Sequence, residues 1–144
     1  MTARLEEIIE TFASVDDETR LQLLLDYSRK LPDLPERFHA ELDEGVRVVP
    51  ECMTPVSLWV EPNNGSVGIF VHVGEEAPTV RGFLSILIDG FADASPGEIL
   101  SSPTNLIQRL GLSNVIRMTR FVGLSAILGR IRKRVGELTQ ETPS

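Results

Sequence analysis

The chain has 144 residues, of which 42% are hydrophobic and 24% charged, a composition typical of one globular domain. Its 14 basic and 21 acidic residues give a net charge of −7, which disfavours nucleic acid as the main partner. A single cysteine excludes an internal disulfide, and no Cys/His cluster offers a zinc site. Without a signal segment or a bilayer-spanning apolar run, we expect a cytoplasmic protein with no membrane partner.

Two amphipathic helices are predicted near the N-terminus, because apolar residues recur there at steps of three and four. Two prolines, at positions 32 and 35, end the second helix, since each disfavours helical backbone angles in the residue before it. A short helical piece over residues 36–42 is also consistent with the sequence. The two apolar stripes are Leu5, Ile8, Ile9 and Phe12, followed by Leu21, Leu24, Leu25 and Leu31.

Three strands are predicted in the middle of the chain, over residues 46–49, 56–60 and 67–73. Asn64-Gly65 is a strong signal for a two-residue hairpin turn between the last two. This turn places Trp59 opposite Phe70 on a second, exposed face, either as a satellite cluster or as a docking patch. The predicted core face of the sheet contains Val56, Leu58, Val60, Ile69, Val71 and Val73.

Helices follow to the end of the chain. The helix after Pro78 should be the most buried, and two Ser-Pro starts, at Ser95 and Ser102, predict two short helices. A long C-terminal helix has apolar residues at steps of three and four, and its basic run should be a solvated face, although it could also meet an acidic partner. The basic run consists of Arg130, Arg132, Lys133 and Arg134.

The predicted fold class is α+β, with a short three-stranded antiparallel sheet packed on one side by helices in the order ααβββαααα. We expect one domain over residues 1–138 and a flexible tail over residues 139–144.

Cys52 is the central candidate for chemistry, because the sequence has no Gly-rich phosphate loop, no nucleophile elbow and no metal-binding His pair. Pro50 and Pro55 frame it on a stiff loop. A lone intracellular cysteine can also be a small buried hydrophobe, and this alternative stays open from the residues alone. Glu51 disfavours a thiolate beside it, which suits a thiol that accepts an atom better than one that attacks a carbonyl.

Three further side chains could support Cys52. His72 lies across from Ser57 in the predicted register, as either a sheet-face histidine or a partner of the thiol. Arg81 and Arg120 are each expected near a helix N-terminus, which is electrostatically unfavourable for a cation, so an anionic neighbour could hold each of them there. Both could equally be surface arginines.

Several segments, together with Cys52, resemble the SufE family of sulfur-acceptor proteins. They are Leu-Pro-Asp-Leu-Pro at 31–35, Glu-Glu-Ala-Pro-Thr-Val-Arg-Gly at 75–82, Leu-Gly-Leu at 110–112 and Thr-Arg-Phe-Val-Gly-Leu at 119–124. Cys52 stands where the family has its active-site cysteine. No single motif is specific, but their order is. The commonest family motif differs, with Gly before the cysteine, Gln-Ser after it and Trp five places on, where this chain has Glu51, Met53, Thr54 and a later Trp59.

The resemblance implies a SufE/NifU-like fold and a carrier that takes persulfide sulfur onto Cys52 from a SufS-type cysteine desulfurase. The carrier would activate that desulfurase and supply an iron–sulfur scaffold. Pyridoxal phosphate would belong to the desulfurase, so we expect no bound cofactor, no metal, and a monomer or weak homodimer. From the residues and the resemblance together, the supporting or docking residues that we expect are Glu51, His72, Glu75, Glu76, Arg81 and Arg120.

Two alternatives remain. The chain could be a binding module that regulates a desulfurase or another partner without carrying sulfur. It could also use Cys52 as a peroxide-type redox nucleophile, although no resolving cysteine is available.

Overall fold

The computed structural model of the protein describes residues 1–44 and 55–141 and has the predicted α+β class. The C-terminal helix, Met118–Glu141, continues beyond residue 138, where we expected the folded domain to end. In chain order the elements are α1 (Ala3–Ala13), α2 (Asp17–Ser28), η1 (Glu36–Phe38), α3 (His39–Glu44), β1 (Val56–Asn63), β2 (Ser66–Val73), α4 (Pro78–Gly90), α5 (Pro96–Leu100), α6 (Leu106–Arg109), η2 (Leu112–Asn114) and α7 (Met118–Glu141).

β1 and β2 form the predicted hairpin. Asn64 and Gly65 have φ of 50° and 89°, the left-handed values that a two-residue turn of this kind requires. The register pairs Leu58 with Val71, as expected from that turn. Within the described residues the sheet has two strands, and the third predicted strand, residues 46–49, lies outside them.

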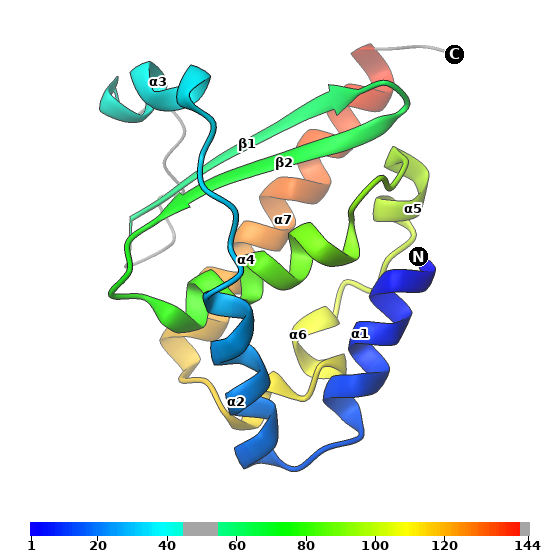
Figure 1. The fold of residues 1–144 in the computed structure, drawn as a ribbon. Helices are drawn as coiled ribbons and strands as arrows, with labels where there is room; N and C mark the ends of the chain where they lie inside the picture. Colours follow the sequence, from blue (N-terminus) through cyan, green and yellow to red (C-terminus); the bar gives the residue numbers. More distant parts are fainter. Residues whose placement is uncertain (45–54, 142–144) are drawn as a thin grey trace.

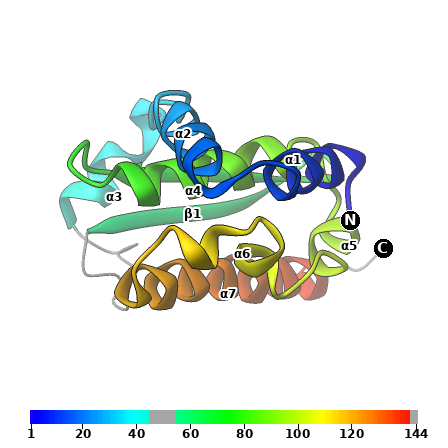
Figure 2. The ribbon, with the colours of Figure 1, turned by 90° about the horizontal axis from the view of Figure 1, so that it is seen from below.

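Helices cover the predicted core face of the sheet. α7 crosses behind the two strands and α4 lies beside β2 (Figure 1). From below, β1 lies between a layer of α1, α2 and α4 and a layer of α6 and α7 (Figure 2). Five of the six predicted core residues of the sheet are buried, and Ile69 is partly buried against the same core.

The second face of the sheet is covered as well, so the prediction of helices on one side only was wrong. Phe38 of η1 lies over this face, with ring centroids 4.9 Å from Trp59 and 5.0 Å from Phe70. Trp59 is only 3% exposed, and its indole N–H donates to Glu41 of α3. The Trp59–Phe70 pair is therefore a satellite cluster in which Trp59 is buried and Phe70 half-buried, because the segment before the strands folds back over it.

The buried face of α2 differs from the predicted leucine stripe. Leu21 is 39% exposed, whereas Arg20 and Leu24 face inward, so the stripe is rotated by one residue. The Arg20 guanidinium donates to the carbonyls of Phe12 and Val15 at 2.8 and 2.6 Å. Arg20 thus satisfies backbone acceptors at the end of α1 and in the turn that follows, which explains why a charged residue can be buried here.

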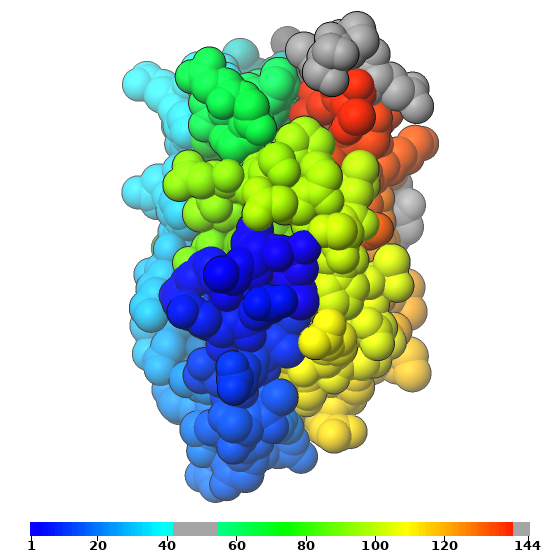
Figure 3. Space-filling model, turned by 90° about the vertical axis from the view of Figure 1, so that its right-hand side faces the viewer, coloured from blue at the N-terminus to red at the C-terminus, as the bar shows by residue number. Residues whose placement is uncertain are grey.

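The basic run of α7 is also only partly a solvated face. Arg132 donates to three carbonyls at the end of α5, those of Ile99, Leu100 and Ser102, at 2.8–3.2 Å. A cation is favourable there because it neutralises the negative end of a helix. Figure 3 shows α1 and the α5 segment side by side on one face, where the Met1 amino group donates to Ser101 at 2.6 Å.

Candidate functional site

A surface hollow of about 250 Å³ lies where β2 ends and α4 begins. We call it the β2–α4 hollow. Three separate parts of the chain line it: the turn after α2, the end of β2 with the turn that follows, and the first turns of α4. The lining residues are Leu31, Pro32, Asp33, Leu34, Val71, His72, Val73, Gly74, Glu75 and Arg81.

Arg81 fastens the turn between β2 and α4. Its Nη1 donates to the carbonyl oxygen of Val73 at 2.8 Å, and its side chain lines the hollow. The expected anionic neighbour is therefore replaced, within the described residues, by a neutral carbonyl at the end of a strand. A carbonyl is sufficient because it accepts the guanidinium proton while part of the charge remains open to water.

His72 and Glu75 share the hollow with Arg81. His72 is exposed and pairs with Ser57 in the register that the sequence predicted. Glu75 and the neighbouring Glu76 are exposed just before α4, where carboxylates are favoured by the positive end of the helix dipole. The hollow thus presents the imidazole of His72 from the end of β2, the carboxylate of Glu75 from the turn that follows, and the guanidinium of Arg81 from the first turn of α4.

The other predicted site residues are not part of the hollow. Arg120 is half-buried in the first turn of α7 and does not line it. Cys52 and Glu51 lie outside the described residues. The described chain resumes at Pro55, and Val56 pairs with Val73 at the edge of the hollow.

Asp33 is a polar residue of the hollow that the sequence did not single out. It lies between the two prolines of the Leu-Pro-Asp-Leu-Pro segment, which we interpreted as a helix stop. The signal that could have identified Asp33 is that it is the only polar residue in an otherwise apolar segment, where it stands between two prolines. Among residues 1–44 and 55–141, no group of three His, Cys, Asp or Glu side chains could hold a metal ion.

Comparison with known proteins identifies the family. A family model described as "SufE: Fe-S metabolism associated domain" matches residues 6–135. The chain belongs to the SufE family. This assignment confirms the resemblance drawn from the motifs and gives the protein a role in iron–sulfur metabolism.

Relatives and a solved structure agree with the SufE assignment. Uncharacterized SufE-like proteins of two Mycobacterium tuberculosis strains are 36% identical over 138 residues, covering 95% of this chain and 94% of theirs. The cysteine desulfuration protein SufE of Plasmodium falciparum is 24% identical over 137 residues, 92% of this chain and 53% of that protein. The solution structure of a hypothetical protein from Thermus thermophilus has a TM-score of 0.78 and 33% identity, covering 93% and 94% of the two chains.

No described helix of this SufE chain has both the length and the apolar content needed to cross a bilayer.

Proposed function

We propose that this SufE protein accepts persulfide sulfur on Cys52 from a pyridoxal-phosphate-dependent cysteine desulfurase of the SufS type. The observation that carries the proposal is that Cys52 is the only cysteine of the chain and lies inside the range matched by the SufE family model, residues 6–135. The name of the Plasmodium relative, cysteine desulfuration protein, supports the same reaction. The sulfur would then pass to an iron–sulfur scaffold.

The transfer step is a thiol exchange. The Cys52 thiolate attacks the outer sulfur of the desulfurase persulfide, a bond forms between these two sulfurs, and the sulfur–sulfur bond of the donor breaks. The desulfurase cysteine leaves as a thiolate, and Cys52 becomes a persulfide. One sulfur atom with its hydrogen changes carrier, and no outside oxidant or reductant is consumed.

The β2–α4 hollow supports a docking role for the residues around it. His72, Glu75 and Arg81 line one open depression, and Glu76 is exposed beside it. Both signs of charge are present, so a polar segment of the desulfurase can be met by donors and acceptors together. Arg120 is proposed to organise the cysteine because it belongs to the segment at 119–124 that resembles the family motif. Glu51 is proposed for the same role because it directly precedes Cys52 in the sequence.

The test is sulfur uptake measured by intact mass. The purified protein is mixed with a cysteine desulfurase and L-cysteine, and we expect a species with one added sulfur atom that disappears on treatment with a thiol reductant. Cys52→Ser should show no such species. Omission of L-cysteine from the wild-type reaction is the matched control for adventitious sulfur.

Two results would count against the proposal. The first is equal sulfur uptake by Cys52→Ser and wild type, or uptake by neither. The second is full stimulation of desulfurase turnover by Cys52→Ala, which would select the binding-module function. Rapid sulfenic acid formation at low peroxide concentration would instead favour a redox thiol.

A further inference from the structure

The charges of the chain are segregated along the sequence. Between Glu98 and Glu137 there is no acidic residue, although the chain contains 21. The same stretch holds seven of the 14 basic residues, so the part of the protein built from α6, η2 and α7 is basic in a chain whose net charge is −7. The seven are Arg109, Arg117, Arg120, Arg130, Arg132, Lys133 and Arg134.

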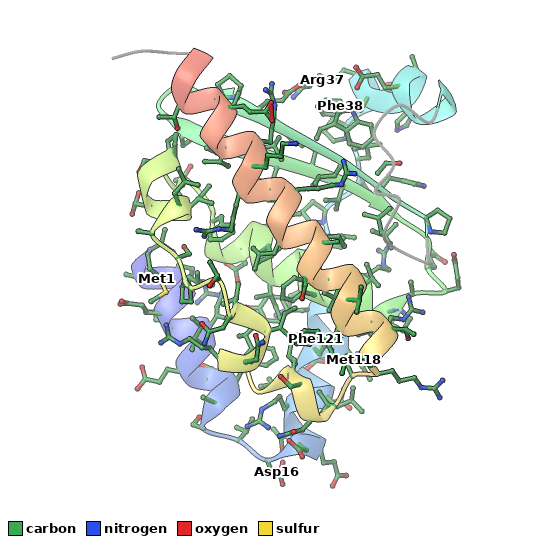
Figure 4. All side chains as sticks on the ribbon, turned by 180° about the vertical axis from the view of Figure 1, so that it is seen from behind. Met1, Asp16, Arg37, Phe38, Met118 and Phe121 are labelled. Carbon is green, nitrogen blue, oxygen red and sulfur yellow. The ribbon has the colours of Figure 1, made fainter. Side chains whose placement is uncertain are left out.

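An exposed apolar surface lies within this basic stretch. Met118 is 75% and Val122 is 54% exposed, and they are two of the three large hydrophobic residues that are exposed among residues 1–41 and 55–139. Beside them is a hollow of about 290 Å³ lined by Gln108, Ser113, Ile116, Met118 and Phe121. Met118 and Phe121 lie together at the start of α7 (Figure 4). We call Ile116, Met118, Phe121 and Val122 the Met118 patch.

The fold does not use the outer part of this patch. The inward face of α7 is already filled by Leu124, Ile127 and Leu128, which are at most 4% exposed. Met118 and Val122 are four residues apart on one helix and therefore project from one side of it. Two neighbouring, exposed apolar side chains beside a hollow form a surface that gains free energy when a partner covers it.

The patch lies at the same end of the molecule as the β2–α4 hollow. Figures 1 and 2 both show the first turns of α4 and of α7 at one end, and the two helices are in contact. A protein–protein interface of ordinary size buries about 800 Å² on each partner. A partner that covers the start of α4 with such an area would also reach the start of α7.

We propose that the Met118 patch is a second part of the desulfurase docking surface, and that it receives an apolar side chain flanked by carboxylates. The identity of the partner rests on the proposed function, whereas its chemistry rests on the patch. Exposed Arg117 directly precedes Met118, exposed Arg109 directly follows the hollow-lining Gln108, and no acidic residue from this stretch competes for them. A second copy of this chain fits less well, because a symmetric contact would bring the two Arg117 charges together.

The test is a binding measurement that does not depend on sulfur transfer. Cys52→Ser is used as the background and titrated with a purified cysteine desulfurase in the absence of L-cysteine. We expect Val122→Glu and Met118→Glu to weaken binding at least about tenfold, since each places a charge in an apolar contact and adds an acid opposite carboxylates. The wild-type affinity should fall as salt is raised from about 50 to about 300 mM, and Arg117→Glu should reduce that salt dependence.

Leu21→Glu is the matched control. Leu21 is an exposed hydrophobic residue as well, at 39%, but it lies in the first half of α2 close to Asp17 and Glu18, whereas the β2–α4 hollow is lined by residues that follow the end of α2. Its substitution should change the affinity by less than about twofold. All of these positions are exposed, so the variants should keep the helical circular dichroism of the parent.

The outcomes separate the two proposals. Weaker binding by Val122→Glu, with no sulfur uptake by wild type, supports the docking surface and overturns the carrier function. Equal binding by Val122→Glu and the parent, or affinity that is independent of salt, overturns the docking surface whatever happens to the sulfur. Concentration-dependent dimerisation that Val122→Glu abolishes, or binding of a polyanion such as heparin in place of the desulfurase, would also overturn it.

Discussion

Asp89 joins the three helices on one side of the fold, and replacing it with asparagine tests how that side is held together. Its carboxylate on α4 accepts the Nε and Nη2 protons of Arg4 from α1 at 2.9 and 2.7 Å. It also accepts the hydroxyl proton of Tyr27 from α2 at 2.8 Å. Asp89→Asn keeps the shape of the side chain but removes the charge that both donors meet.

The expected loss of stability in Asp89→Asn follows from how exposed the interacting side chains are. The side chains of Arg4 and Asp89 are 52% and 32% exposed, so solvent screens their pair, which should contribute only about 0.2–1 kcal/mol. The Tyr27 hydrogen bond to a charged acceptor is half-buried and should contribute about 1–2 kcal/mol, part of which a neutral amide retains. We therefore expect Asp89→Asn to lower the free energy of unfolding by about 1–2 kcal/mol at neutral pH.

The direction of the Asp89 pKa shift determines how the stability difference between wild type and Asp89→Asn changes with pH. The Arg4 guanidinium, and then the Tyr27 hydroxyl, hold the pKa of Asp89 below its usual range, although partial burial works the other way. A depressed folded-state pKa means that the stabilisation is complete above the unfolded value of about 3.9 and is lost as the pH falls through the folded value. The stability gap between wild type and Asp89→Asn should thus close in acid.

The titration of Tyr27 at alkaline pH provides a second test with the same variant. Burial, and then the hydrogen bond to Asp89, raises the pKa of Tyr27 to about 12. This raised pKa stabilises the fold below the unfolded value of about 10, and the contribution is lost as the pH rises toward the folded value. In Asp89→Asn the phenol should titrate at a lower pH, because burial remains while the carboxylate is gone.

The assay is urea unfolding followed by the fluorescence of Trp59, the only tryptophan, at several pH values. Asp26→Asn is the control, because Asp26 pairs with Arg29 at 3.2 Å on an open surface, with side chains 45% and 72% exposed. That control should change stability by less than about 0.5 kcal/mol. If the two variants lose equal stability, or if the Asp89→Asn gap is the same at acid and neutral pH, the three-helix junction is not held through this carboxylate.

Two further predictions concern packing. Phe38→Ala should cost about 3 kcal/mol and shift the Trp59 emission to longer wavelength, because the buried Phe38 ring covers the indole, and unchanged emission would contradict this. Gly111→Ala should cost about 2 kcal/mol or more in urea unfolding, since Gly111 has φ of 74° and an added Cβ would lie 2.6 Å from Arg20 Nε. The matched Gly129→Ala, with open space around it, should raise stability by up to about 1 kcal/mol, and an equal loss in both would refute the Arg20 contact.

The hairpin shows where sequence reasoning is strongest. Asn64-Gly65 specifies a turn type through backbone sterics alone, and the turn then determines the register of every pair in β1 and β2. No long-range information is needed, so the pairing of Ser57 with His72 could be predicted before any tertiary contact was known.

Sequence reasoning is weakest for the segments that pack against the second face of the sheet. Alternation identifies two faces but cannot say which distant segment covers the second one. Phe38 follows two prolines in a stretch with little periodicity, yet its ring packs against both Trp59 and Phe70. Arg20 is a similar case, because its burial depends on free carbonyls at the end of another helix. Such acceptors are a property of the folded chain and leave no local pattern in the sequence.

The candidate site was predictable in part. The strand register selected His72 and the family resemblance selected Glu75, and both share the β2–α4 hollow with Arg81. The partner of Arg81 was not predictable, because its acceptor is the Val73 carbonyl and every residue carries one. The role of Cys52 is a proposal that rests on the family assignment and on the fact that Cys52 is the only cysteine in the sequence.

The motifs that identify the family divide into two physical kinds. Gly82 and Gly111 hold the fold: an added Cβ on Gly82 would lie 2.4 Å from the carbonyl oxygen of Leu24, and one on Gly111 would meet Arg20. These glycines are needed for close contact between helices whatever the protein does. Asp33 of the 31–35 segment and Glu75, at the opposite end of the 75–82 segment from Gly82, line the hollow and contribute no described core packing. The family assignment thus rests both on glycines that allow close packing and on residues that line the hollow, whereas Glu51, where the commonest family motif has glycine, lies outside the described residues.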